Sequence, residues 1–392
     1  MRDKKSLVTL SLLKKVLEVF SSFFLNIYLF KIVNGDFNFL LLYAAINAIA
    51  GCLLTLFFDK IISSKNANFI FRFGFLCGIA SMAILLVLKE QTLDVIWLFA
   101  LLQRIANVSY YVVYEVTLIR STKTHSLSSY VAGVNILGSI ITLIAPVIIG
   151  YTITSFSWTL IFILMLIDSI VSVIVASKVD FKVIQKTFRL TKYWKKVSKN
   201  RTMRQAYFAT FLKRLSGTDG VLEYILPIML FLTLGTEFSV GSYDSLFSIV
   251  YIIMLEIVRI LNRRRMTKRI YIPLALLCLA GAAIMLADFT YFSVLVYYFT
   301  IKTGGTLIMT ESSSMICAVG NKQKLGDYVR EHQLTWNIFL TLGNLAGILI
   351  AFVIYNYFYS KEAFAAVIFA LMMFFVLQAY FLQKIEKKLQ NA

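Results

Sequence analysis

Two carboxylates inside an apolar stretch of this chain are spaced for proton chemistry. Asp219 and Glu223 are four residues apart, so both lie on one face if the stretch is helical. Carboxylates this close repel each other in a low-dielectric site, and one of them is expected to hold a proton near neutral pH. A carboxyl group that gains and loses a proton in this range is suited to couple proton flow to transport.

The residues around this pair leave two interpretations open. Gly217 and Gly220, with a proline at position 227, permit local unwinding that would turn free backbone groups toward a substrate. Alternatively, Lys213, Arg214 and Glu223 form ion pairs between helices, and the proline only kinks the helix. The first interpretation predicts a site for substrate and protons, whereas the second is purely structural.

Basic side chains also lie inside apolar stretches, where each costs at least ~2.5–3.5 kcal/mol on insertion scales. Arg104 lies ten residues beyond Asp94, about 15 Å into its stretch at 1.5 Å per residue. Lys302 occupies a similar place in the second half of the chain. The two cations would suit one anionic group bound between the halves, or a coupling network with carboxylates. Salt bridges that only hold helices together are the alternative.

Other polar residues complete the predicted site. Glu115 lies eleven residues after Arg104, on the same helical face. Glu311 lies nine residues after Lys302, which puts the two on opposite faces of a straight helix. Asp168 has no partner that the sequence identifies. The remaining candidates are three cavity residues, where an Asn can equally be a contact between helices, and a pair at a cytoplasmic gate: Tyr111, Asn135, Asn337, Asp59 and Lys60.

The composition indicates that these residues belong to a membrane protein. Hydrophobic residues make up 59% of the 392 residues and the mean hydropathy is +0.79, whereas soluble domains hold roughly 45–50% apolar residues. We expect an all-helical protein in which each membrane span takes about 20 residues. The twelve predicted spans are 8–33, 39–58, 69–88, 94–119, 129–153, 158–177, 205–234, 243–262, 270–287, 291–318, 329–354 and 362–383.

A basic run from Lys178 to Arg204 divides the spans into two groups of six. It holds ten Lys or Arg residues and one acid, and such a run is retained on the cytoplasmic side. With both termini cytoplasmic, 31 of the 39 basic residues fall on that side and three in outer loops. The predicted domains are therefore bundles at 1–177 and 205–392, joined by a loop at 178–204. This orientation explains the net charge of +19 without nucleic acid as a partner.

Few residues are suited to metal binding or covalent catalysis. The four cysteines include no CxxC pair and are expected to be reduced, and the two histidines lack metal-site spacing. The HxxxxD, HExxH and GxSxG patterns of enzymes do not occur in the sequence. We therefore expect no enzyme, no metal and no cofactor, with energy supplied by a proton gradient.

The two groups of spans repeat short patterns, as the halves of duplicated transporters do. Lys14-Lys15 in span 1 matches Lys213-Arg214 in span 7, an offset of 199 residues. Asn135-Ile136 in span 5 matches Asn337-Ile338 in span 11 in the same way. These matches predict two related bundles.

With twelve spans and a basic central loop, the chain resembles the major facilitator superfamily over its whole length. After span 2 it keeps Asp59-Lys60 of the family's Gly-x-x-x-Asp-Arg/Lys-x-Gly-Arg/Lys motif, without the glycines. Span 4 has Arg104 and Asn107 where the family has Arg-x-x-Gln-Gly. Span 5 keeps Pro146 and Gly150 of the antiporters' Gly-Pro-x-x-Gly-Gly signature. The resemblance implies that span 4 lines the cavity and that its arginine takes part in proton coupling.

The resemblance implies a secondary transporter working by alternating access, and the acids in spans 4, 7 and 10 favour proton-coupled export of a small molecule. Two alternatives stay open. One is a carrier or flippase of an anionic or lipid-linked substrate, and the other is a transporter-like sensor or immunity protein without transport. The expected partners are the substrate and membrane lipids, with the chain a monomer. The Lys-, Asn-, Ile- and Phe-containing composition favours the plasma membrane of an AT-rich bacterium.

Overall fold

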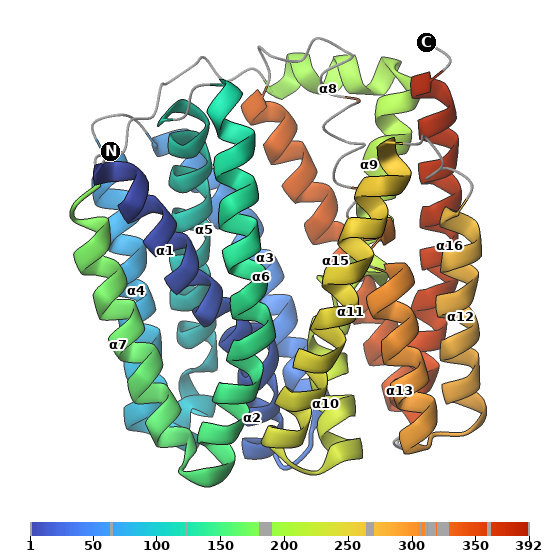
Figure 1. Cartoon of the computed structure of the whole chain (residues 1–392), viewed down its shortest axis with the longest axis horizontal. Coiled ribbons are helices and arrows are strands. Elements are labelled where there is room, and N and C mark those ends of the chain that lie inside the picture. The colour runs from blue at the N-terminus through green and yellow to red at the C-terminus, as the bar shows by residue number, and fades with distance from the viewer. Residues whose placement is uncertain are drawn as a thin grey trace. The chain divides into compact units, whose positions relative to one another are not determined.

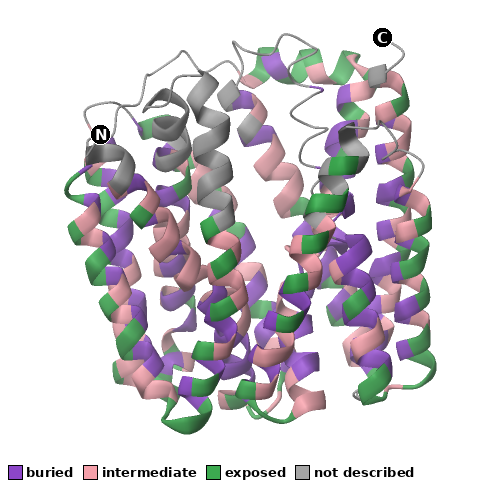
Figure 2. Ribbon diagram, viewed as in Figure 1, coloured by how far each residue is buried: buried purple, intermediate pink, exposed green. Residues whose placement is uncertain are grey.

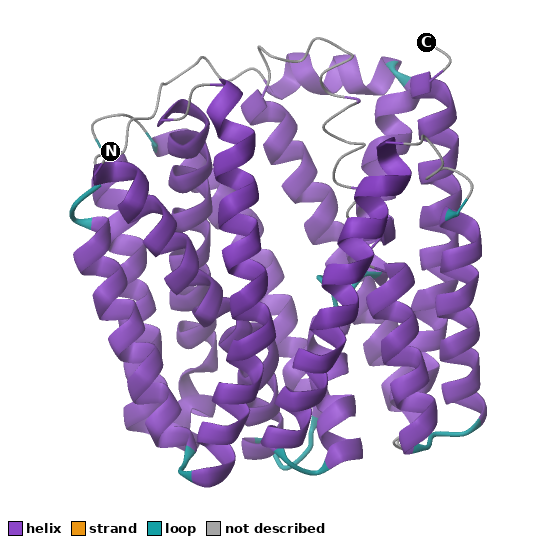
Figure 3. Cartoon of the chain, viewed as in Figure 1, coloured by secondary structure: helices purple, strands orange, loops and turns teal. Residues whose placement is uncertain are grey.

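The described part of the chain is helical and contains no strand (Figure 1; Figure 3). The all-helical fold class predicted from the composition is therefore confirmed. The structure is a computed structural model that describes residues 2–62, 66–121, 124–179, 190–263, 270–305, 307–309, 312, 319, 329–358 and 362–390.

The chain forms two compact units. The first comprises Met1–Thr187 and Gly235–Ser245, and the second comprises Phe188–Leu234 and Leu246–Ala392. The division thus falls inside the predicted central loop, and eleven residues from the second half of the sequence belong to the first unit. The domain bounds 1–177, 178–204 and 205–392 stay a prediction.

The first unit is a bundle in which α4 packs on α5 and α7, and α1 packs on α6 and α7. The π-helical turn η1 continues α1 into α2, so the chain is helical from Arg2 to Ile32. Such turns are frequent at functional sites, because the inserted residue changes which side chains face a neighbour. The elements are α1 (Arg2–Val19), η1 (Phe20–Phe24), α2 (Leu25–Ile32), α3 (Phe37–Ile61), α4 (Ala67–Leu88), η2 (Lys89–Val95), α5 (Ile96–Ser121), α6 (Thr124–Ser155) and α7 (Trp158–Ala176).

In the second unit α9 packs on α15 and α16, and α12 packs on α16. Predicted span 7 is broken, because α9 ends at Ser216 and α10 begins at Leu222. The elements are α8 (Leu190–Lys199), α9 (Arg201–Ser216), α10 (Leu222–Leu234), α11 (Glu237–Arg263), α12 (Tyr271–Ala287), α13 (Tyr291–Thr300), the π-helical turn η4 (Ile301–Gly305), α15 (Val329–Phe358) and α16 (Glu362–Gln390). The start of α11 belongs to the first unit.

Several helices are long and apolar enough to cross a membrane, so the chain is a multi-pass membrane protein. The seven segments are Phe37–Phe58, Ala67–Val113, Leu137–Ser155, Trp158–Ala176, Tyr291–Met309, Leu334–Phe358 and Glu362–Lys388. Two shorter apolar helices are Leu222–Leu234 and Tyr271–Ala287. The count of twelve spans stays a prediction.

Exposed residues run along these helices (Figure 2), and many of them are large and apolar. Leu53 is 61% exposed, Phe69 69% and Val87 73%. A soluble protein rarely exposes such residues in contiguous patches, whereas lipid chains are an apolar surrounding for them. The exposure pattern therefore agrees with a bundle embedded in lipid.

The first turn of α11 is held tightly within the first unit. Lys31 Nζ lies 2.5 Å from Glu237 Oε1, and the Glu237 side chain is only 8% exposed. A Cβ at Gly150 of α6 would lie 2.5 Å from the backbone oxygen of Glu237, and a Cβ at Gly241 would lie 2.1 Å from that of Pro146. Only glycine permits helices to approach this closely.

A buried cluster of polar rings attaches α8 to the second unit. The hydroxyl of Tyr193 lies 2.5 Å from that of Tyr207 on α9 and 2.9 Å from His332 Nδ1 on α15. Tyr207 Oη lies 2.5 Å from the same nitrogen. The neighbouring Trp194 donates from Nε1 to Thr335 Oγ1 at 3.1 Å. These contacts fix one face of a helix that is otherwise largely exposed.

Acidification is expected to loosen α8 from this cluster. His332 Nδ1 accepts a hydrogen bond only while the imidazole is neutral, and burial lowers the pKa of His332 from its usual value of 6.5. The pKa of Tyr193 is raised to about 12, by burial and by the charge of Glu331, so its hydroxyl stays a donor throughout. A released His332 binds more protons than a docked one below pH 6.5. The docked state is therefore fully stabilised above pH 6.5 and loses stability as the pH falls below it.

This prediction is checked by Trp194 fluorescence between about pH 8 and pH 5, with Trp194→Phe as the background. The emission should shift on acidification in the wild type, and His332→Gln should flatten the profile because glutamine does not titrate. A profile that is the same in both proteins would contradict the prediction.

Candidate functional site

A cluster of charged side chains lies between α1 and α5 of the first unit. Lys14 is only 8% exposed and its Nζ donates to Asn107 Oδ1. One turn on, Glu18 accepts from Lys15 Nζ at 3.3 Å and from the hydroxyl of Tyr111. Asn107 is the residue at which the family's span 4 motif departs from Gln, and Tyr111 is a predicted cavity residue.

Asp168 on α7 belongs to the same cluster. Among the charges that act on Lys14 are, from largest to smallest, Glu18, Arg104, Asp168 and Lys15. Asp168 Oδ2 is buried and has no hydrogen-bond partner in the part of the chain that the structure describes. A partner for this carboxylate cannot be identified from the sequence, because Lys14 lies on another helix 154 residues earlier. The cluster thus combines three cations with two acids.

Arg104 is positioned by the absence of a side chain on α3. A Cβ at Gly51 would lie 2.3 Å from Arg104 Nε and 2.8 Å from Arg104 Cζ, so the guanidinium group crosses α3 directly over this glycine. The arginine lies on α5, the helix that also carries Asn107 and Tyr111.

Replacing Gly51 with alanine is expected to displace Arg104 without removing it. The new methyl group cannot share space with the guanidinium group, so the charge must move relative to Lys14. Substrate binding in detergent should weaken by about tenfold, which is the cost of one poorly placed charged hydrogen bond. Gly138→Ala, where no atom lies within 4 Å of the added Cβ, is the matched control. Equal affinities in the two variants would contradict the placement of Arg104 in the site.

A second polar chain links α5 to span 1 beside this cluster. The hydroxyl of Tyr43 donates to Gln103 Oε1 at 2.6 Å, and Gln103 Nε2 donates to Ser21 Oγ at 3.3 Å. Ser21 lies in the π-helical turn η1. The sequence analysis did not single out these three residues, since short polar side chains in spans are common. The hydrogen bonds orient the helical turn that follows Lys14 and Glu18.

The second unit has its own charged site at the break between α9 and α10. Asp219 Oδ2 lies 3.2 Å from Arg214 Nη1 and 3.6 Å from Lys213 Nζ. The predicted unwinding is observed, and a Cβ at Gly220 would lie 1.8 Å from the backbone oxygen of Arg214. This close approach explains why a glycine occupies the break.

The shared helical face expected for Asp219 and Glu223 is wrong. Asp219 precedes the first residue of α10, Leu222, so the four-residue spacing does not run along one helix. The negative charge of Asp219 is instead matched by two adjacent cations. Glu223 acts electrostatically on Arg214.

Lys302 lies in the second π-helical turn, η4. Its Nζ lies 5.2 Å from the centroid of the Tyr298 ring one turn earlier, a cation–π distance. Of the other predicted residues, Asn337 is half-buried on α15 and Lys60 is exposed near the end of α3. Four of the predicted residues lie outside the described residues or side chains: Asp59, Glu115, Asn135 and Glu311.

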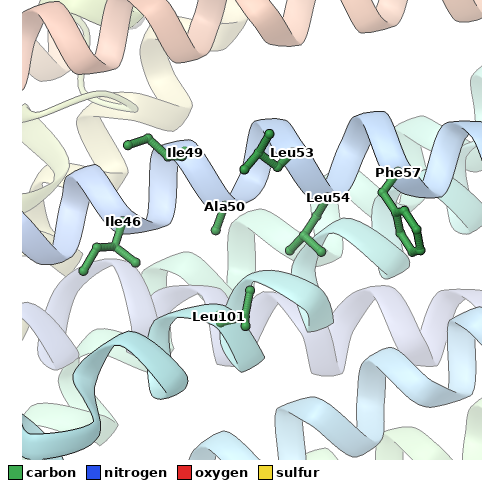
Figure 4. A pocket seen from close by; sticks show the side chains of 7 residues that line it. All are labelled: Ile46, Ile49, Ala50, Leu53, Leu54, Phe57 and Leu101. Carbon is green, nitrogen blue, oxygen red and sulfur yellow. The ribbon is translucent and has the colours of Figure 1, made fainter.

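An apolar groove of about 400 Å³ runs along α3 (Figure 4). Leu101 of α5 closes one side. Leu53 and Phe57 of α3 also line it and are more than half exposed. Neither Gly51 nor Arg104 is among the residues that line this groove.

Comparisons with known proteins place this geometry in a family. A family model described as Major Facilitator Superfamily matches residues 16–329. None of the curated proteins compared matches the chain significantly. A variant of the nucleoside transporter NupG has a similar structure, with a TM-score of 0.74 and 14% identity over 97% of this chain and 99% of that one.

Two further solved structures have the same fold. A bacterial homologue of the iron transporter ferroportin, in its inward-facing state, gives a TM-score of 0.68 at 14% identity over 98% of each chain. A structure described as a bacterial metal transporter gives 0.63 at 14% identity over 100% of this chain and 99% of that one. At this identity the similarity shows the fold and not the substrate.

Proposed function

Because the chain belongs to the major facilitator superfamily, we propose that it couples proton flow to the export of a small molecule. Its family and its structural neighbours make it a secondary transporter rather than an enzyme. The neighbours are described as carriers of nucleosides and of metals. The charged cluster of α1, α5 and α7, rather than either of those substrates, is the basis of the proposal.

The observation that carries the proposal is the carboxyl group of Asp168. Its Oδ2 is buried without a hydrogen-bond partner in the described part of the chain, and its charge acts on the buried Lys14. Protonation of Asp168 removes its negative charge, so Glu18 is then the one carboxylate of the cluster that balances its three cations. Binding of a cationic amphiphile is then disfavoured by charge repulsion, so proton uptake promotes its release. Alternating access would convert this competition into exchange of substrate for protons.

The direction of transport is supported by α6. Pro146 and Gly150 are the residues that this chain shares with the antiporter signature of the family. Both take part in close backbone packing against the start of α11 within the first unit. The proposed substrate site and this packing are built on adjacent helices, since α1 packs on α6.

A second candidate is import or flipping of an anionic substrate, which the excess of cations favours. Lys14, Lys15 and Arg104 outnumber Glu18 and Asp168, and Arg104 and Lys15 both repel Lys14. An anionic group would relieve this repulsion. Protonation of Asp168 would then strengthen binding rather than weaken it, so proton and substrate would move together. A sensor or immunity role without transport is the third candidate.

The test is flux in proteoliposomes that contain a pH-sensitive dye. The substrate panel would include cationic drugs, sugars, amino acids, and phosphorylated or lipid-linked anions. Exchange of a cationic or neutral compound for protons, abolished by a protonophore, would support the proposal. Co-transport of an anion with protons would instead select the second candidate. Substrate flux that ignores the pH gradient would overturn proton coupling, and no flux of any compound would favour the sensor.

A further inference from the structure

The second unit carries basic residues where α9 begins and α16 ends. Lys388 Nζ donates to Gln205 Oε1 at 3.0 Å, which brings the two helix ends together. Lys388 is also acted on by the positive charges of Arg201 and Lys384. Arg204 lies one turn after Arg201 and is likewise exposed. These cations repel one another, so the cluster is suited to an anion.

Exposed aromatic residues continue both helices directly from these cations. Phe208 follows Arg204 by four residues on α9 and is 39% exposed, whereas Tyr380 precedes Lys384 by four residues on α16 and is 47% exposed. Lys384 Nζ lies 5.7 Å from the Tyr380 ring centroid. The rings of Phe208 and Phe381 are 5.1 Å apart and join the helices at this level. Each helix therefore runs from cations to apolar surface along one face.

We propose that this seam binds one anionic phospholipid, with its phosphate on the cations and an acyl chain along the aromatic side chains. The α9–α16 seam is defined as Arg201, Arg204, Lys384, Lys388, Phe208 and Tyr380. Its cations lie at the end of the apolar segment Glu362–Lys388, which is where lipid headgroups meet a spanning helix. A free phosphate would use the cations alone, whereas a lipid uses both halves of the seam.

The amphipathic helix α8 adds to the positive field at this end of the unit. Tyr193 is buried against α9 and α15, while Lys192, Lys195 and Lys199 are exposed. At 100° per residue, each of these lysines lies at least about 100° around the helix from Tyr193. Their charge attracts anionic lipids over roughly a Debye length without contacting the seam. The seam itself supplies the specific contacts.

The test is native mass spectrometry of the full chain from detergent with equal amounts of phosphatidylglycerol and phosphatidylcholine. The wild type should retain phosphatidylglycerol preferentially. Lys384→Gln/Lys388→Gln should lower that retention by about tenfold or more, as expected for two phosphate-binding lysines. Arg72→Gln/Lys178→Gln removes the same charge from exposed positions of the first unit and should have no effect. Unfolding midpoints in phosphatidylcholine alone verify that both variants are folded.

A second variant separates a lipid from a free anion. Tyr380→Ser should reduce retention of phosphatidylglycerol, because the acyl chain loses its apolar contact. Inorganic phosphate and glycerophosphoglycerol should not displace the bound lipid at millimolar concentrations. The proposal is overturned if either one displaces it, which indicates an adventitious ion only. It is equally overturned if the seam variants retain lipid as the wild type does, or if the control loses as much. These readouts do not depend on transport.

Discussion

Replacing Asp168 with asparagine is expected to abolish proton-driven transport and to weaken, without abolishing, the binding of a cationic substrate. Asparagine keeps the shape of the side chain but cannot ionise, so its effect on Lys14 no longer depends on protons. The variant resembles the permanently protonated state of the cluster. Flux driven by a pH gradient should fall by about tenfold or more, since even 1.4 kcal/mol of lost coupling is a factor of ten.

Two transport modes distinguish this loss of coupling from general damage. Exchange of labelled for unlabelled substrate needs no net proton movement and should continue in Asp168→Asn. Asp94→Asn makes the same substitution at an exposed acid of η2 and should keep both modes. Gradient-driven flux at the wild-type rate in Asp168→Asn would contradict the assignment and move attention to Asp219 and to the two undescribed acids, Glu115 and Glu311.

Replacing Gly343 with alanine is expected to destabilise the second unit. A Cβ at Gly343 of α15 would lie 2.2 Å from the backbone oxygen of Phe211, and one at Gly347 would lie 2.9 Å from that of Leu215. Backbone atoms in a packed helix cannot give way as a flexible side chain can, so α15 and α9 must separate. Overpacking of this kind costs about 1–3 kcal/mol.

The direction of the stability change distinguishes Gly343→Ala from an unhindered substitution. Alanine is a better helix former than glycine by about 1 kcal/mol, so an unhindered Gly→Ala change should be neutral or stabilising. Gly138→Ala on α6 meets no atom within 4 Å and serves as that reference. The unfolding temperature in detergent should fall for Gly343→Ala and not for Gly138→Ala. A rise in both variants would show that α9 and α15 are less tightly packed than described.

The sequence predicts the helices well, but it predicts much less about which residues of different helices contact one another. Long apolar stretches predicted the helices, because a membrane requires internally hydrogen-bonded backbone. The glycines around Asp219 predicted the break in span 7, since they are the residues that permit it. The same break invalidated the helical face assigned to Asp219 and Glu223. A spacing argument holds only within one uninterrupted helix.

The partners of single charges were beyond the sequence for a different reason. Periodicity tells which face of α7 carries Asp168, but not that α1 brings Lys14 near it. Arg104 can be singled out from the sequence, because an arginine inside an apolar stretch is unusual in itself. Gly51 cannot, because its role appears only when the packed arginine is seen. The ring cluster at His332 joins three elements separated by up to 139 residues and has no local signal.

The eleven residues after Leu234 determine where the chain can be divided into fragments that assemble. They belong to the first unit, where Glu237 meets Lys31 and where Gly241 packs on Pro146. A fragment that stops in the central loop lacks this segment, so Gly150 and Pro146 would face an empty groove and Lys31 would lose its carboxylate. Co-expressed halves should therefore assemble only when the C-terminal fragment donates its α11 start. A self-sufficient N-terminal fragment would need residues 235–245 fused behind α7.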